Sequence, residues 1–558
     1  MEFTQDEGER ASAGLGSRRG HAAAALGLDF GTESCRAILV DIDSGEELAT
    51  AVAAYESGVM DRTLPSGVSL PREWALQDPD DYLRSMSNAV NEAIAGACVS
   101  PQDIVGVGVA FTACTALPAR ADGMPLCKIP QMRDRPHAWV KLWKHHGAQP
   151  EADIINELAV QRNERFLDYY GRRISSEWLI PKLLQVYLED REVYDRAARF
   201  IEAGDWVVMQ LTGVESRNTC AAGYKGLWSD ALDYPTAELL NACAPGFGDT
   251  ALEKITGALV APGVRAGTLT PSAARLLGLC EGIPVSAAII DAHAGVVGSG
   301  VFGPGTMAMI MGTSACQIVM TETPSIFRGY AGLARDGIVP GFYGYEYGQS
   351  AVGDVFAWFV RSCVPFEYYQ EAQREDISIL GLMERKASMA PPGGESGEIV
   401  ALDWLNGNRS VLMDSSLRGV ISGIALSTKP EEIYRALVEA TAFGAKKILQ
   451  THEAGAGHVE GIVACGGLSR NALIMQIYAD VMGRRIAVAG SSQPVALGAA
   501  IFGALAGLST QPHDIATTAA PMIPPYHAEY SPDNRNADTY SRLYNAYCEL
   551  HDYFGLRR

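Results

Sequence analysis

The feature that most constrains the fold of this chain is a hairpin pattern that occurs twice, far apart in the sequence. In residues 25–41 an apolar run ends in Asp29 and a glycine-threonine turn, and an alternating stretch then returns. Residues 305–320 repeat this order, with a Gly-Thr-Ser turn. Apolar runs bounded by glycine turns are typical of strands. The echo predicts two duplicated domains that each present one hairpin to a shared cleft; two unrelated hairpins in two α/β domains are the alternative.

The rest of the chain alternates strand and helix patterns. Strands are predicted at residues 104–110 and 462–465, and helical patterns over 175–212, 430–450 and 471–482. Such alternation is typical of α/β domains, and 558 residues exceed what one hydrophobic core supports. We expect a disordered tail over 1–25, an N-terminal domain over 26–298, a C-terminal domain over 299–510 and a helical tail over 511–558.

The composition argues against several classes of partner. The chain has 45 basic and 65 acidic residues, a net charge of −20, whereas nucleic-acid binding needs a basic surface. Residues 493–512 lack charge, but they are rich in glycine and alanine, which favours a buried helix over a membrane span. The eleven cysteines form no CxxC pair, as expected for reduced thiols. We therefore expect a cytoplasmic protein that binds neither nucleic acid nor membrane.

The glycine turns are suited to binding phosphate. Backbone N–H groups in a turn of small residues approach phosphate oxygens closely, and a Thr or Ser hydroxyl adds a donor. Three such turns occur, at residues 29–32, 312–314 and 465–468, and Asp29 offers an oxygen ligand for Mg²⁺. A P-loop is absent, because no lysine follows a glycine. The GxGxxG match at 298–303 is followed by Pro304, which argues against a dinucleotide-binding turn.

Taken together, these motifs resemble a known superfamily. Residues 28–32, 311–314 and 464–468 resemble the two phosphate motifs and the adenosine motif of sugar kinases, heat-shock proteins and actin. Gly423-Ile424 and the helix that contains residues 432–439 are similar to a signature of the FGGY carbohydrate kinases. The resemblance implies an α/β fold of two actin-like (ribonuclease H-like) domains flanking a central catalytic cleft, with ATP and Mg²⁺ as cofactors.

Longer matches resemble the branch of this family that acts on ribulose. They lie at residues 111–115, 137–146, 222–225, 291–294, 344–350, 403–409 and 550–555. The resemblance implies ATP-dependent phosphorylation of the 5-hydroxyl of a ketopentose, L-ribulose, to L-ribulose 5-phosphate in arabinose catabolism, by a homodimer. The alternatives are a kinase of D-ribulose, ribitol or xylulose, and a non-catalytic actin-like ATP-binding scaffold.

The resemblance also assigns roles to individual residues. Asp291 is expected to be the catalytic base, and Asp29 is expected to bind Mg²⁺. The expected sugar contacts are Ala113, Lys225, Asp291 and Glu346. The expected contacts to ATP and its phosphates are Gly31, Thr32, Gly312, Thr313, Gly444, Gly466, Gly467 and Asn471.

Several of these residues have an ordinary structural alternative. Asp is a favoured N-cap, so Asp291 could instead cap a helix that begins at Ala292. Lys225 could be a solvated surface lysine. Gly444 lies inside a predicted helix, where glycine costs about 1 kcal/mol relative to alanine, so we expect a packing or ligand reason for it.

Two pairs of side chains near residue 140 are interpreted as structural. Trp139 and Trp143 lie in a helix-like pattern, where tryptophan is more often part of the core than a sugar-stacking face. His145 and His146 have no third ligand in the sequence, so we interpret them as structural and not as metal ligands.

Overall fold

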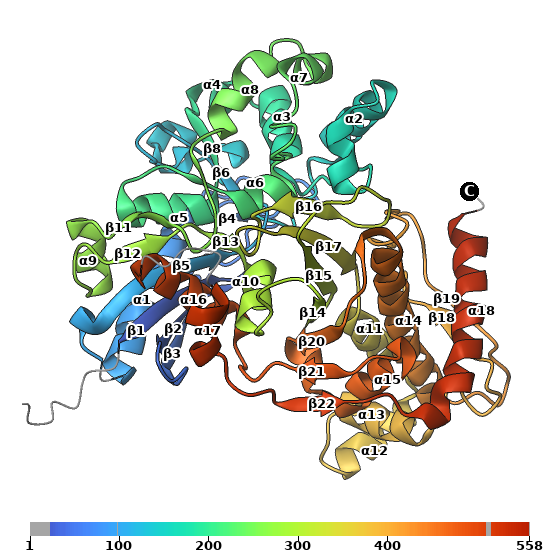
Figure 1. Cartoon of the computed structure of the whole chain (residues 1–558). Coiled ribbons are helices and arrows are strands. Elements are labelled where there is room, and N and C mark those ends of the chain that lie inside the picture. Colours follow the sequence, from blue (N-terminus) through green and yellow to red (C-terminus); the bar gives the residue numbers. More distant parts are fainter. Residues whose placement is uncertain (1–22, 98, 509–514, 557–558) are drawn as a thin grey trace, which may run out of the picture.

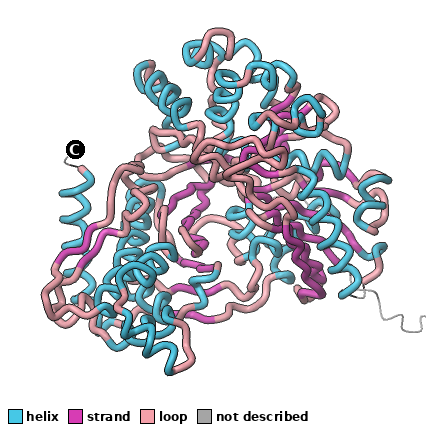
Figure 2. The backbone as a smooth tube through the Cα atoms, turned by 180° about the vertical axis from the view of Figure 1, so that it is seen from behind, coloured by secondary structure: helices cyan, strands magenta, loops and turns pink. Residues whose placement is uncertain are grey.

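The structure, a computed structural model, describes residues 23–97, 99–508 and 515–556. The described residues form two seven-stranded mixed sheets in separate halves of the molecule, and a smaller α/β region lies above the first sheet (Figure 1). Seen from behind, loops connect the two halves (Figure 2). Residues 1–22 of the tail predicted over 1–25, residues 509–514 at the predicted boundary between C-terminal domain and helical tail, and residues 557–558 lie outside the described residues. The predicted tail is too long, because Ala24 and Ala25 are buried residues of the first strand.

The first sheet contains the N-terminal hairpin. Its strands are, in spatial order, β11 (Arg265–Thr268), β12 (Pro284–Ser286), β5 (Ile104–Phe111), β1 (Ala24–Phe30), β2 (Ser34–Asp41) and β3 (Glu47–Ala54), and β13 (Ile289–Ile290) also pairs with β5. The strands β1, β2 and β3 are antiparallel, whereas β5 runs parallel to β1 and β12 runs parallel to β5. Helix α1 (Pro79–Ala97) precedes β5 and packs on β2 and β3.

The second sheet contains the repeated hairpin. Its strands are, in spatial order, β16 (Gly332–Arg335), β17 (Tyr343–Gln349), β15 (Ala315–Thr321), β14 (Thr306–Met311), β20 (Gly461–Cys465), β21 (Ile486–Val488) and β22 (Ala528–Tyr530). The run β17-β15-β14-β20-β21 repeats the spatial order, chain order and strand directions of β3-β2-β1-β5-β12. A long helix, α14 (Pro430–Ala456), precedes β20 as α1 precedes β5. The predicted duplication is therefore confirmed.

Two helices fill the space between the sheets. Helix α10 (Asp291–Gly298) packs on β14 and β15, and α16 (Pro494–Leu508) packs on β1 and β5 and against α10. Glycines make this contact close: a Cβ on Gly27, Gly108 or Gly298 would collide with the α16 backbone. The uncharged stretch is thus a buried helix, as predicted, and no helix among the described residues is long and apolar enough to span a membrane. Although α16 lies in the C-terminal half of the sequence, it packs on the N-terminal sheet.

The region above the first sheet is an insertion with its own core. Its four strands are, in spatial order, β4 (Leu76–Gln77), β7 (Val140–Lys141), β6 (Ala116–Ala119) and β8 (Arg199–Glu202). Its helices are α2 (Gln149–Gln161), α3 (Leu179–Glu189), α4 (Arg191–Arg196), α7 (Ala237–Cys243) and α8 (Gly248–Ile255). Of the two helices between α4 and α7 in the chain, α5 (Ala203–Thr212) packs on β5 and β11 of the first sheet, and α6 (Thr219–Lys225) packs on β16 of the second. The continuous helical pattern predicted over 175–212 is wrong, since β8 interrupts it and pairs with β6.

The remaining elements extend the two halves. On the first sheet lies α9 (Pro271–Leu277), and β9 (Arg217–Asn218) pairs with β10 (Leu259–Val260). The C-terminal half adds α11 (Gly353–Cys363), α12 (Phe366–Arg374), α13 (Ile379–Met389), β18 (Val400–Leu402), β19 (Val420–Ser422), α15 (Ala472–Met482), α17 (Ile515–Ala519) and α18 (Ala537–Gly555). The predicted helix over 471–482 corresponds to α15, and that over 430–450 extends as α14 to Ala456.

Candidate active site

Three strand ends of the first sheet meet at one edge. Strand β1 pairs in parallel with β5 so that Phe30 lies opposite Phe111, and β13 pairs with β5 so that Ile290 lies opposite Phe111. The residues that directly follow these three positions therefore come together. They are Gly31 and Thr32, Thr112 and Ala113, and Asp291. The sheet register thus unites the predicted phosphate turn, sugar turn and base.

Asp291 is the first residue of α10, whose N-cap is Ile290, so the N-cap interpretation of Asp291 is wrong. Its Oδ1 accepts a hydrogen bond from the backbone N–H of Ala292 at 2.7 Å. Burial, followed by the negative charge of Asp29, raises the pKa of Asp291 to about 7. A carboxyl group with a pKa near neutrality is well matched to accept a proton from a hydroxyl.

Asp29 lies in β1, opposite Arg36 of β2. The Nη1 of Arg36 is 3.3 Å from Oδ2 of Asp29. Burial raises the pKa of Asp29 to about 6, although the charge and hydrogen bond of Arg36 act in the opposite direction. The strand ends therefore bring Asp29 and Asp291 close enough for the charge of Asp29 to raise the pKa of Asp291.

The second sheet presents its own pair of turns at an equivalent edge. Ile310 at the end of β14 lies opposite Cys465 at the end of β20, so Gly312-Thr313 and Gly466-Gly467 follow neighbouring strands. Gly466 has a φ of +93°, and a Cβ there would collide with the carbonyl oxygen of Met311. Only glycine allows this close approach of the two turns.

Asn471 and Gly444 have protein partners in this structure. The side chain of Asn471 caps α15 by accepting from the N–H of Ile474 at 3.1 Å. A Cβ on Gly444 would lie 2.7 Å from Nε2 of Gln349 and 3.0 Å from Oδ2 of Asp403. Packing against these side chains is therefore a sufficient reason for a glycine inside α14.

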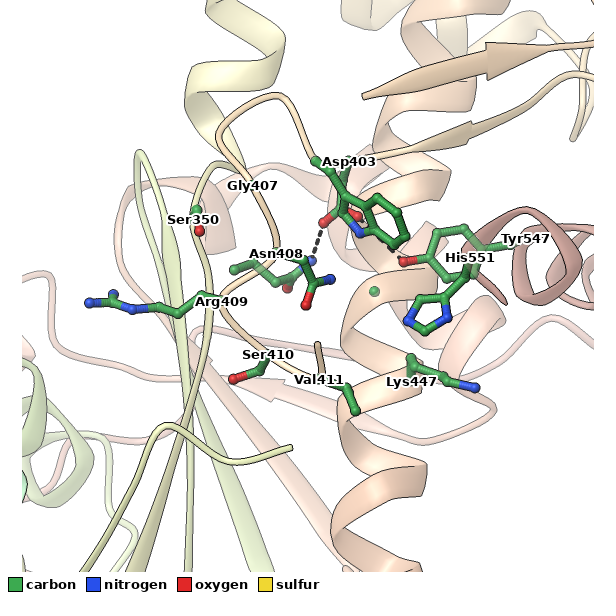
Figure 3. Close-up of a pocket in the computed structure, with 13 residues that line it drawn as sticks. Ser350, Asp403, Gly407, Asn408, Arg409, Ser410, Val411, Lys447, Tyr547 and His551 are labelled. Atoms are coloured by element: carbon green, nitrogen blue, oxygen red, sulfur yellow. Dashed lines mark hydrogen bonds between the residues drawn. The ribbon is translucent and has the colours of Figure 1, made fainter. Parts of the chain in front are cut away.

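Gly444 lines a small pocket between α14, α18 and the loop that follows β18 (Figure 3). Within it, Asp403 accepts hydrogen bonds from Gln349 at 2.9 Å and from Tyr547 at 3.4 Å. Arg409, on the same loop, points away from the pocket. The loop therefore contacts the C-terminal helix α18 at the pocket and carries the Arg409 side chain outside it.

Lys225 and Glu346 form a buried ion pair between the two halves. Lys225 is the last residue of α6 and Glu346 lies in β17; the Nζ is 2.7 Å from Oε1 and 3.0 Å from Oε2. The two side chains are 6% and 4% exposed, so the surface-lysine interpretation of Lys225 is wrong. Burial alone would raise the pKa of Glu346, but the charge of Lys225 and the nearby His293 hold it well below its usual range.

A neighbouring aromatic side chain anchors this ion pair. Tyr224 is fully buried, and a Cβ on Gly332 or Gly337 would approach its ring at 2.8 and 2.6 Å. A Cβ on Gly344 would collide with its hydroxyl. Glycines on and beside β16 and β17 thus form a slot for Tyr224, which fixes α6 and its Lys225 on the second sheet.

A second ion pair also joins the two halves, but here the acid belongs to the N-terminal half and the base to the C-terminal half. Glu177, which precedes α3, lies 3.4 Å from Nη2 of Arg409 and 3.1 Å from Nε2 of His146. Burial opposes ionisation of Glu177, but the His146 hydrogen bond and the Arg409 charge lower its pKa to about 2. Sequence reasoning gave no role to either acid or base of this pair. The only signal was that Arg409 ends one of the ribulose-type matches.

The tryptophan interpretation is half right. Trp139 is 4% exposed and belongs to the core, as expected. Trp143 is 37% exposed, and its Nε1 donates to Oγ1 of Thr32 at 3.0 Å, so it lies beside the phosphate turn. His145 is buried and bonded to Gln185, which fits its structural interpretation.

Comparison with known proteins gives this geometry a family. The N-terminal domain model of the FGGY family of carbohydrate kinases matches residues 24–298, and the C-terminal domain model of the same family matches residues 307–507. The chain belongs to the FGGY family of carbohydrate kinases. The predicted family, and with it a sugar kinase, is confirmed.

Several relatives match the FGGY chain over nearly its whole length. A ribulokinase of Anoxybacillus flavithermus is 47% identical over 534 residues, which cover 95% of this chain and 94% of the relative. A ribulokinase of Mycolicibacterium smegmatis is 44% identical, with 95% and 94% covered. Among solved structures, the xylulose kinase of Rhodospirillum rubrum superposes with a TM-score of 0.77 at 22% identity, covering 95% and 98% of the two chains. The expected fold of two actin-like domains is confirmed.

Proposed function

We propose that this FGGY kinase transfers the γ-phosphoryl group of ATP to the 5-hydroxyl of L-ribulose, giving L-ribulose 5-phosphate in arabinose catabolism. The observation that carries the proposal is the convergence of Asp291, with a pKa near 7, on the strand edge that also holds the Gly31 and Ala113 turns. Sequence identity of 46–47% to proteins named ribulokinase, over 95% of this chain, supports the choice of sugar.

The mechanism assigns proton transfer to Asp291. Its carboxylate accepts the proton of the attacking 5-hydroxyl as the new bond to the γ-phosphorus forms and the bond from that phosphorus to the bridging oxygen of ADP breaks. This role requires reach and a suitable pKa. Lys225 and Glu346 bind sugar hydroxyls, with Ala113 beside them. Because a charged group makes a stronger hydrogen bond than a neutral one, the pair imposes a directional pattern on the substrate. Closure of the two halves excludes water from this transfer.

The two glycine turns bind the phosphates in this proposal. Gly31 and Thr32 approach from the first half, while Gly312 and Thr313 approach from the second. Backbone N–H groups and threonine hydroxyls supply the donors, so a chain with a net charge of −20 holds ATP without a basic patch. On the adenosine side we propose Gly444, Gly466, Gly467 and Asn471.

The residues present fit Mg²⁺ at Asp29. Asp29 adds to the raised pKa of Asp291, so positive charge beside it would relieve a repulsion that the site contains. Mg²⁺ takes one or two protein carboxylates and completes its shell with water and phosphate oxygens, so a single aspartate can serve as its protein ligand. When bound, Mg²⁺ neutralises charge on the phosphates of ATP. Asp29 would hold it.

A substrate panel tests the proposal. We expect sugar-dependent ADP release with kcat/KM highest for L-ribulose, and lower for D-ribulose, ribitol and L-xylulose. A higher value for another of these sugars would assign the chain to a different pentulose or pentitol kinase of the same family. We retain a homodimer and a cytoplasmic location as parts of the proposal, to be tested by sedimentation and fractionation.

A further inference from the structure

A lysine is buried beneath the strand edge that carries Ala113, and no carboxylate in the part of the chain that the structure describes is bonded to it. Lys182 of α3 is 0% exposed. Its Nζ donates to the carbonyl oxygen of Cys114 at 2.5 Å and to that of Leu142 at 2.8 Å. Burying an ammonium group is costly unless specific partners compensate for the lost water. Here the partners are two backbone carbonyls from separate segments.

The first carbonyl belongs to the turn that carries Ala113. Cys114, the next residue, has a φ of +53°, a left-handed conformation that is uncommon for a residue other than glycine. The hydroxyls of Thr112 and Thr115 lie 2.9 Å apart across the same turn. Such a conformation persists only where surrounding contacts impose it, and Lys182 makes one of them.

The second carbonyl connects the turn to the phosphate side. Leu142 directly precedes Trp143, whose indole N–H bonds the hydroxyl of Thr32. One ammonium group therefore ties the turn with Ala113 to the segment that contacts the first phosphate turn.

We propose that Lys182 is a positioning residue of this kinase: it holds the turn at Ala113 and Cys114 in its left-handed conformation and fixes that turn relative to Trp143. The proposal rests on the proposed role of Ala113 in sugar binding. Lys182 touches neither the substrate nor the reacting atoms. It acts through the backbone of the turn that contacts the sugar.

A matched pair of variants separates this role from simple burial. Lys141 of β7 is also 0% exposed, but its Nζ contacts Oε1 of Gln185 and the ring of Trp74 instead of the turn. Lys182→Met is expected to lower kcat/KM for L-ribulose about 10- to 100-fold, the range for loss of a charged hydrogen bond. The loss should be mainly a raised KM for the sugar, with a smaller change in the KM for ATP. Lys141→Met should change the sugar KM less than about 3-fold by the same reasoning.

A rescue variant gives the deciding result. Glycine adopts a left-handed conformation freely, so Cys114→Gly in the Lys182→Met background is expected to recover most of the lost sugar affinity. An unchanged sugar KM in Lys182→Met, equal losses in the two lysine variants, or a loss that Cys114→Gly does not relieve would each overturn the proposal. If Lys182→Met does not fold, Lys182→Gln carries the same test. Failure of the wild type on every sugar would instead overturn the proposed function.

Discussion

The ion pair between Lys225 and Glu346 allows a quantitative test of how the two halves are joined. At 2.7 Å and an effective dielectric constant near 20, the gross attraction is about 6 kcal/mol, of which desolvation removes a large part. Lys225→Met leaves Glu346 as a 4% exposed carboxylate, with His293 Nε2 3.3 Å away as a partial replacement. We therefore expect the free energy of unfolding to fall by about 3 kcal/mol, toward the lower end for breaking a buried pair.

A double-mutant cycle measures the interaction itself. Glu346→Gln removes the other charge, so the double variant should be more stable than the sum of the single losses implies, with a coupling energy of at least about 1.5 kcal/mol in urea denaturation. The control pair is Arg191 and Asp195 on α4, also 2.7 Å apart but 55% and 56% exposed. Its coupling should stay within about 0.5 kcal/mol. Equal coupling in the two cycles would refute the argument that burial strengthens the Lys225–Glu346 interaction. In addition, Lys225→Met and Glu346→Gln should each raise the KM for the sugar.

Two further predictions address the nucleotide turn and pH. Gly466→Ala places a Cβ against the backbone of Met311 at a positive φ, so it should lower the free energy of unfolding by about 1–3 kcal/mol and raise the KM for ATP. Gly467→Ala is the control, because no described atom lies within 4 Å of its Cβ, and it should leave the stability unchanged. Equal stability losses in the two variants would contradict this reasoning. The hydrogen bond to Glu177 raises the pKa of His146, so the stability that His146 contributes is present below its usual pKa of 6.5 and is lost as pH rises through the raised value. The urea midpoint of wild type should therefore exceed that of His146→Gln at pH 6 by more than at pH 9, and a constant difference would refute the assignment.

Local pattern predicted the parts of the fold that are local. The two hairpins, α14 and α15 depend on short-range apolar spacing and glycine turns, and the sequence carries both. The pattern over 175–212 misled because apolar spacings of three and four also occur where a short strand such as β8 lies between helices. β8 exists because it pairs with β6, a partner more than eighty residues earlier in the chain.

The candidate site was predictable as far as it depends on strand ends. Asp291 and the glycine turns follow apolar strands, so their positions at the ends of those strands follow from the sequence. The burial of Lys225 was not predictable from its neighbours in the sequence, because it requires α6 to dock on β16 of the second sheet, where Lys225 reaches Glu346 of β17. Likewise, Glu177 and Arg409 lie 232 residues apart and meet only when the two halves close on each other. The position of Trp143 beside the phosphate turn was not predicted, because its hydrogen-bond partner, Thr32, is 111 residues away in the sequence.

The kinetics of Asp291→Asn test the central claim most directly. The amide keeps the size of the side chain but cannot accept the proton of the attacking hydroxyl. With folding verified by circular dichroism, sugar-dependent ADP formation at saturating ATP and L-ribulose should show a kcat about 10²- to 10⁴-fold below wild type, the range for loss of a general base. The KM for L-ribulose should change much less. A turnover close to that of wild type would contradict the assignment of Asp291 and, with it, the mechanism proposed for this kinase.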